Sequence, residues 1–240
     1  MVLLEICVDS VESIQNAVYG GADRIELCSA LSEGGLTPNV GLFCAAKRIT
    51  KNTKSKIFTM IRIRGGNFNY SNDELSAMIE EVKYFKDNHA DGIVFGALTE
   101  NYQIDIEACK KILDAWGNDK PATFHRAFDE THPDDISKNL KVIEDLGFAR
   151  ILTSGLEGTA EAGIKNIQKM MQLTEKLIIM PGSGLNINNV QFIVNKTGCK
   201  EVHGSARTEM DISTRISVGG STFYVCDKNK VEKIYKLLKI

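Results

Sequence analysis

Eight short apolar segments recur along the chain, and stretches with helical periodicity separate them. Parallel strands joined by helices need repeats of about 30 residues, and eight such repeats account for the 240 residues of the chain. The sequence therefore predicts an α/β fold in which eight βα units close into a (β/α)8 barrel of the TIM type. The eight expected strands cover residues 3–8, 24–28, 57–63, 92–96, 122–127, 149–153, 177–180 and 201–205.

Local signals support the helices between these strands. Ser71 and Glu74 have the spacing of a capping box at a helix start. Pro133 suits a first helical turn, and Gly147 suits a helix end. No linker rich in serine or proline divides the chain, so we expect one domain over residues 1–240. An open doubly wound sheet is the alternative fold, but its glycine-rich dinucleotide motif does not follow the first expected strand.

Composition and charge exclude several classes of protein. Apolar residues make up 43% of the chain and charged residues 25%, which is typical of a globular protein. A net charge of −2 provides no attraction to nucleic acid or to an anionic membrane. Glu5 interrupts the first apolar run too early for a secretory signal. The six cysteines lie far apart, which predicts reduced thiols in a cytoplasmic protein rather than disulfides or a zinc finger.

Polar residues alternate with apolar ones along five of the expected strands. Side chains two residues apart share a face, and the apolar face of a barrel strand packs under the helices. The polar face should therefore point into the barrel, where charge is costly to bury unless it is paired or bound. The inward residues are Glu5, Cys7 and Asp9; Glu26 and Cys28; Met60, Arg62 and Arg64; Thr123 and His125; and Glu201, His203 and Ser205.

Two interpretations of these inward charges stay open. They could form an interior network of Glu–Arg pairs with a structural role only. They could instead line a catalytic mouth, because barrel enzymes build their active sites at the C-terminal ends of the strands. In that case Arg62 and Arg64 would bind substrate oxygens, while Glu5, Glu26 or His125 would move protons.

The two inward histidines add to the candidate catalytic residues. His125 shares its strand end with Arg126 and Asp129, either of which could hold its tautomer or its charge. His203 brings a second imidazole to the same mouth.

Glycine-rich loops follow the last two expected strands. Gly182, Ser183 and Gly184 follow the seventh, and Gly204 and Ser205 follow the eighth. Glycines let backbone N–H groups approach an anion, and these two loops form the usual phosphate site of such barrels. The loops therefore favour a phosphate or another anion, although turns also need glycine.

Long strings of the sequence resemble the CutC copper homeostasis family. They are EICVDSVESIQNAVYGGADRIELCSALSEGGLTP, FTMIRIRGGNFNYS, DGIVFGALTE, TFHRAFD, ILTSG and MPGSG. The similarity runs from the first expected strand to about residues 203–207, and the rest of the chain resembles the family only loosely. The resemblance implies a (β/α)8 barrel, a cytoplasmic homo-oligomer and a role in copper handling, with Cu(I) as the ligand.

The resemblance places the family's proposed copper ligands on Cys7 and Cys28. Each lies two residues after a glutamate on consecutive expected strands, so both thiols should face one mouth. Soft thiolates suit Cu(I), whereas the alternative is two small residues that fill space. Gly204 stands where relatives can carry a cysteine, which leaves two thiols at most.

Two functions from different classes follow. The first is a cytoplasmic copper homeostasis protein that binds Cu(I) through Cys7 and Cys28. The second is a barrel enzyme, namely an isomerase, epimerase or lyase, that acts on a small phosphorylated or anionic metabolite.

Overall fold

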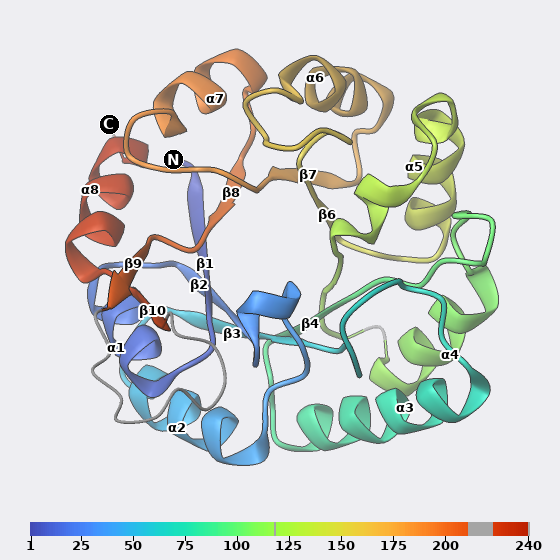
Figure 1. The fold of residues 1–240 in the computed structure, drawn as a ribbon, viewed down its shortest axis with the longest axis horizontal. Helices are drawn as coiled ribbons and strands as arrows, with labels where there is room; N and C mark the ends of the chain where they lie inside the picture. The colour runs from blue at the N-terminus through green and yellow to red at the C-terminus, as the bar shows by residue number, and fades with distance from the viewer. Residues whose placement is uncertain (118, 211–222, 240) are drawn as a thin grey trace.

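Eight parallel strands form a barrel that a ring of helices surrounds (Figure 1). This is a computed structural model, and it describes residues 1–117, 119–210 and 223–239. The barrel strands are β1 (Leu3–Val8), β2 (Arg24–Leu27), β3 (Lys56–Met60), β4 (Gly92–Phe95), β5 (Ala122–Phe124), β6 (Arg150–Thr153), β7 (Ile178–Pro181) and β8 (Glu201–Gly204). The predicted (β/α)8 fold class is confirmed.

The strands pair in the order β7-β6-β5-β4-β3-β2-β1-β8. All seven ladders are parallel, and β7 and β8 lie side by side, so the barrel is nearly closed. Because parallel strands all end at the same rim, the loops that follow them gather at one mouth.

Eight helices cover the outside of the barrel in the described ranges. They are α1 (Val11–Tyr19), α2 (Val40–Thr50), α3 (Asn72–Asp87), α4 (Ile106–Trp116), α5 (Ile136–Asp145), α6 (Ile164–Leu173), α7 (Val190–Thr197) and α8 (Lys228–Leu238). Short 3₁₀ turns cover Leu31–Glu33, Arg126–Glu130 and Pro133–Asp135. An antiparallel pair, β9 (Arg207–Met210) and β10 (Phe223–Cys226), lies between β8 and α8. Within these ranges no helix is both long and apolar enough to cross a bilayer.

The expected helix signals have their predicted roles. Ser71 and Glu74 form both hydrogen bonds of a capping box at the start of α3. Pro133 is the first residue of the 3₁₀ turn that leads into α5, and Gly147 has a φ of 91° just after that helix.

Two strands, β3 and β5, end three residues before their predicted ends. β3 ends at Met60 because the backbone of Arg62 bonds to Thr37 instead of to a neighbouring strand. The Arg62 N–H donates to the Thr37 hydroxyl, and the Arg62 carbonyl accepts from the Thr37 N–H. β5 ends at Phe124 because a 3₁₀ turn begins at once, capped by the side chain of His125. After both strands, the backbone stops pairing with the neighbouring strand and becomes a loop at the mouth of the barrel.

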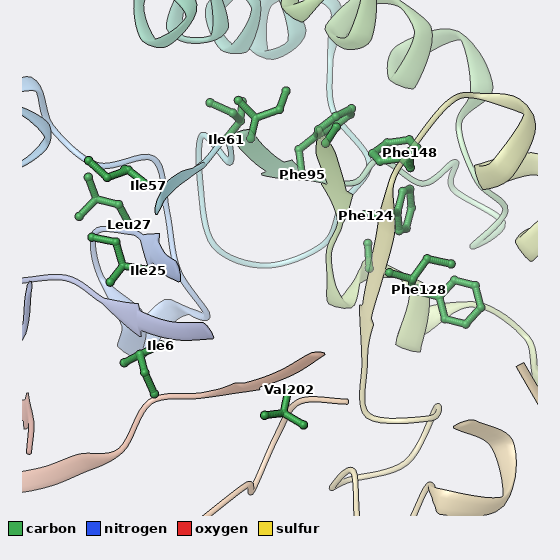
Figure 2. Close-up of a cluster of buried hydrophobic side chains, with 14 of the residues drawn as sticks. Ile6, Ile25, Leu27, Ile57, Ile61, Phe95, Phe124, Phe128, Phe148 and Val202 are labelled. Atoms are coloured by element: carbon green, nitrogen blue, oxygen red, sulfur yellow. The ribbon is translucent and has the colours of Figure 1, made fainter. Parts of the chain in front are cut away.

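Strand alternation separates two apolar regions. The outward residues of the strands pack against the helices in one large cluster, which Figure 2 shows from Ile6 round to Val202. Inside the barrel, Cys28, Phe58, Met60 and Val94 form a second, small cluster. Leu152 and Met180 also point inward, beside the buried polar residues Glu5, Arg24, Glu26, Arg150, Glu201 and His203. The interior is therefore largely polar, as the alternation along these strands predicts.

Candidate metal and substrate site at the barrel mouth

A cavity of about 810 Å³ opens at the C-terminal ends of the strands. This volume suits a small organic molecule rather than an ion alone. Nine of the residues predicted from the sequence line it, namely Cys7, Glu26, Arg62, His125, Ser183, Gly184, His203, Gly204 and Ser205. Glu5, Cys28, Arg64, Asp129 and Gly182 do not line it.

Cys7, Glu26 and His203 form the floor of this cavity. One potential ligand atom from each residue lies within 4.8 Å of the other two, and all three side chains are buried. Their positions follow from strand register, because Cys7 is paired with Glu26 and the preceding inward residue, Glu5, is paired with His203. Three neighbouring strands thus bring a thiol, a carboxyl group and an imidazole to one point.

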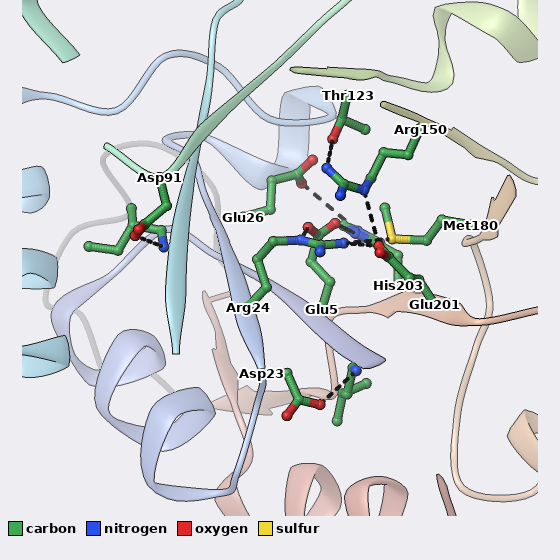
Figure 3. A network of polar contacts seen from close by, with 12 residues as sticks. Glu5, Asp23, Arg24, Glu26, Asp91, Thr123, Arg150, Met180, Glu201 and His203 are labelled. Carbon is green, nitrogen blue, oxygen red and sulfur yellow. Dashed lines mark hydrogen bonds and ion pairs between the residues drawn. The ribbon is translucent and has the colours of Figure 1, made fainter. Parts of the chain in front are cut away.

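Glu5 orients the imidazole of His203 from below. His203 Nδ1–H donates to Glu5 Oε1 at 2.8 Å, while His203 Nε2 lies 3.9 Å from Glu26 Oε2 (Figure 3). A carboxylate behind a histidine fixes the ring and its tautomer, as in many metal sites. Glu5 is therefore a positioning residue, and Nε2 is the ring atom of His203 that lies toward Glu26.

A buried ion network lies beneath this floor. Arg24 pairs with both Glu5 and Glu201, and Arg150 Nε lies 3.1 Å from the same oxygen of Glu201 (Figure 3). Both guanidinium groups also lie over the ring of Phe58, at 4.7 Å and 5.0 Å from its centre. The two carboxylates and two guanidinium groups balance in charge, which makes their burial tolerable.

Arg24 and Arg150 are not among the site residues predicted from the sequence. Arg24 lies two residues before Glu26, so alternation along the strand could have placed it inside the barrel. Arg150 begins its strand, where a positive side chain is easily interpreted as solvent-exposed. The interior Glu–Arg network therefore exists, but Arg24 and Arg150 supply its cations rather than Arg62 and Arg64.

Burial and neighbouring charges give the two glutamates at this site different pKa values. Burial disfavours the charge on Glu5, but Arg24 and His203 outweigh it and lower the pKa of Glu5 to about 2. Burial raises the pKa of Glu26 to about 7. Burial also opposes the charge on His203, but Glu26 outweighs it and holds the pKa of His203 well above its usual range. Near neutral pH, His203 is therefore protonated, whereas Glu26 is only partly ionised, and the protonation of each group depends on the other.

Cys28 lies outside this group of three. Its side chain is fully buried in the apolar cluster inside the barrel, and its thiol donates to Glu26 Oε2 over 3.6 Å. Burial raises the pKa of Cys28 well above its ordinary value. Its role as a second thiolate ligand stays a prediction.

Arg62 and His125 belong to another wall of the cavity. Phe68 lies between them, with its ring centre 4.8 Å from the Arg62 guanidinium carbon and 4.8 Å from the His125 ring centre. Burial, together with the charge of Arg62, lowers the pKa of His125 to about 3. The imidazole is therefore neutral at physiological pH.

Arg64 points away from the cavity. Its Nε donates to Glu74 at 2.5 Å, and its other nitrogens bond to carbonyl groups of residues 65, 67 and 69. Arg64 thus ties the loop after β3 to the start of α3.

Asp129 does not contact His125, so its predicted role as the partner of that imidazole is wrong. Its carboxylate accepts from the N–H groups of Ser154 and Leu156, from the Thr153 hydroxyl and from Arg126. His125 Nδ1 instead accepts from the N–H of Ala127 at 3.2 Å. Because a short turn follows β5, the carboxylate reaches the loop after β6 rather than the ring.

Asp129→Ala should lower the free energy of unfolding by about 2–3 kcal/mol, because it leaves several buried donors without an acceptor. Urea denaturation followed by circular dichroism measures this. Asp145→Ala is the matched control, since Asp145 is exposed and pairs with Lys141 on the surface of α5. Equal losses in the two variants would contradict the assignment of Asp129 as the anchor of this loop.

The glycine-rich loops have different parts in the mouth. Ser183 and Gly184 both adopt positive φ, and Ser183 Oγ donates to the carbonyl of Gly158. Gly182 continues the ladder by donating to Thr153, and a Cβ there would lie 2.5 Å from Leu152. Gly182 therefore serves the strand, whereas the next two residues border the cavity.

The model of the CutC family matches residues 2–208. The chain belongs to the CutC family. The human copper homeostasis protein cutC homolog is 45% identical over 210 residues, which are 87% of this chain and 75% of the human protein. A CutC protein from Streptococcus agalactiae has a solved structure with a TM-score of 0.81 at 34% identity, and the match covers 85% of this chain and 99% of that one.

The CutC barrel also resembles enzymes of distant sequence. Phosphoribosyl anthranilate isomerase from Thermotoga maritima matches all of this chain and 99% of its own with a TM-score of 0.60, at 17% identity. A likeness at that identity concerns the fold alone.

The residues at the floor of this CutC barrel suit a copper ion. A thiolate and an imidazole are both good ligands for copper, and the Glu5–His203 hydrogen bond provides the usual support behind a metal-binding ring. Cys7 and His203 would hold the ion, while Glu26 beside them would adjust the charge of the site.

Proposed function

We propose that this CutC protein binds Cu(I) at the floor of its barrel mouth, through Cys7 and Nε2 of His203. The observation that carries the proposal is the approach of Cys7, Glu26 and His203 to within 4.8 Å of one another. Family membership supports copper as the metal, because curated relatives are named copper homeostasis proteins. A cytoplasmic location and a homo-oligomeric assembly, both expected from the sequence, belong to the same proposal.

The site can couple copper binding to proton release. His203 must be neutral to offer Nε2 as a ligand, and the apo site favours its protonated form. Binding therefore requires that this proton leave, together with the proton of the Cys7 thiol, and Glu26 Oε2, which lies 3.9 Å from His203 Nε2, can accept one of them. Since acid keeps both groups protonated, copper affinity should fall as the pH is lowered.

Cys7→Ser should weaken Cu(I) binding at least about a hundredfold, because it removes the thiolate of the site. An anaerobic titration against a chromophoric Cu(I) chelator measures the affinity and the number of ions bound per chain. Cys44→Ser is the matched control, since the Cys44 thiol is exposed and lies away from the cavity. Equal affinities for the wild type and Cys7→Ser would contradict the proposal.

Cys28→Ser in the same titration tests the second thiolate predicted from the sequence. Loss of affinity comparable to that of Cys7→Ser would place both thiols at the ion. Unchanged affinity would limit the site to Cys7 and His203.

A second candidate function is an enzyme that acts on a small phosphorylated or anionic metabolite. The observation that favours it is the cavity of about 810 Å³ above a carboxyl group whose pKa is raised to about 7. A group with a pKa near the working pH is suited to general acid–base catalysis. Glu26 would move the proton, and a thermal-shift screen of sugar phosphates and organic acids tests for such a substrate.

A further inference from the structure

Arg62 is a buried cation that no carboxylate neutralises in the described part of the chain. Its side chain lines the cavity, and the residue is only 5% exposed. None of the ion pairs between described residues includes it, in contrast to Arg24, Arg64 and Arg150. A buried charge without a partner of opposite sign is costly, so such a residue in a cavity points to an anionic ligand.

Backbone carbonyl groups hold the Arg62 guanidinium in place. Nη1 donates to the carbonyls of Glu33 and Gly35, and Nη2 donates to that of Gly66 at 2.8 Å. Gly34 and Gly35 both have positive φ, which lets the loop after β2 fold around the guanidinium. Carbonyl groups orient the cation without cancelling its charge, and the buried Nε–H has no acceptor among the described residues.

His125 presents a second unused donor beside it. Nδ1 of His125 accepts from the N–H of Ala127, so in the neutral ring the proton lies on Nε2. That Nε2 is buried and has no partner among the described residues. Phe68 contacts both side chains and lines the cavity with them.

We propose that the wall formed by Arg62, Phe68 and His125 binds the oxyanion of a small organic molecule, either a carboxylate or a phosphate ester. Oxygens of such a group accept from the free Nε–H of Arg62 and from His125 Nε2–H, and they neutralise the Arg62 charge. The remainder of the molecule occupies the cavity above Glu26. This inference names the substrate class of the second candidate function and rests on it, but it does not depend on copper.

The test measures oxyanion binding by the copper-free protein. Inorganic phosphate and malonate are titrated separately at constant ionic strength, with binding followed by melting temperature and by ¹⁵N shifts of the histidine rings. We expect at least one of the two anions to raise the melting temperature and to shift the His125 Nε2 resonance. Phosphate alone would identify a phosphate ester, malonate alone a carboxylate, and both a general oxyanion site.

Arg62→Gln should weaken this binding about tenfold or more, since a charge-assisted hydrogen bond and the neutralising charge are lost. Arg64→Gln is the matched control from the same loop, because its guanidinium is already paired with Glu74 and does not line the cavity. If Arg62→Gln does not fold, the ¹⁵N shift of His125 in the wild-type protein decides alone.

Two results would overturn the inference. One is the absence of any shift with either anion, and the other is equal binding by wild type and Arg62→Gln. Because Cys7→Ser should still bind the anion, failure of the copper proposal is distinguishable from failure here. Anion binding without turnover of any screened metabolite would leave this site in place and count against the enzyme.

Discussion

Arg24→Met should lower the free energy of unfolding by about 3–5 kcal/mol, the usual cost of leaving buried charges without their partner. Methionine fills a similar volume but removes the cation that Glu5 and Glu201 share inside the barrel, which leaves Glu5 with His203 alone and Glu201 with Arg150 alone. Glu5 is fully buried, so water cannot replace the lost interaction. Equilibrium urea denaturation at neutral pH measures the change.

Lys141→Met provides the matched control for this prediction. Lys141 also pairs with a carboxylate, that of Asp145 at 2.6 Å, but both side chains are more than half exposed. Its loss should cost less than about 1 kcal/mol because water and salt screen the pair. Arg24→Lys, which keeps the charge but not the fork of donors, should fall between the two. A loss in Arg24→Met no larger than that in Lys141→Met would contradict a structural role for the network.

His125 should make the protein less stable in acid. Its pKa is lowered from 6.5 to about 3 in the fold, so the unfolded chain binds a proton there more readily than the folded protein does. The resulting stability is fully present above pH 6.5 and is lost as the pH falls toward 3. The shift corresponds to about 5 kcal/mol over the whole range, of which about 2 kcal/mol is lost by pH 5.

The measurement is the free energy of unfolding at several pH values between 7 and 4, for the wild type and for His125→Gln. Glutamine keeps an acceptor for the Ala127 N–H but does not titrate, so the difference between the two curves isolates His125. Glu26 acts in the opposite direction, since its raised pKa favours the fold in acid, and it contributes equally to both proteins. His132→Gln is the matched control because His132 is exposed, and its curve should follow that of the wild type.

Persistence of the full acid-dependent loss in His125→Gln would contradict a buried neutral imidazole at this position. It would also weaken the argument for the oxyanion wall, because a charged His125 could not lie unpaired beside Arg62 at neutral pH. The pH series therefore bears on the site as well as on stability.

Much of the barrel could be predicted from local pattern alone. The alternation in Glu5-Ile6-Cys7 and Glu26-Leu27-Cys28 indicates which side chains point inward, because the side-chain period of a strand is two. The number of strands and the position of the mouth follow from the repeat length and from the common direction of parallel strands. Neither inference needs contacts between distant residues.

The partners of each inward side chain could not be predicted in this way. Cys7 and Cys28 share a spacing after a glutamate, yet Cys7 approaches both Glu26 and His203, whereas Cys28 contacts Glu26 from the apolar cluster of Phe58 and Met60. Height in the barrel depends on the register between strands, and Cys7 is paired with Glu26 rather than with Cys28. A shift of two residues keeps the face of the strand but changes the layer.

The sequence by itself determined which face of the polar strands points inward, and hence the largely polar barrel interior. It also determined membership of the CutC family. Only the tertiary structure decided that Arg24 and Arg150 neutralise the buried glutamates, that Asp129 anchors a loop, and that Arg62 pairs with no carboxylate among the described residues. The physical reason is that alternation and propensity act over a few neighbouring residues. Ion pairs and orphaned donors depend instead on strand stagger and on loops that meet only when the barrel closes.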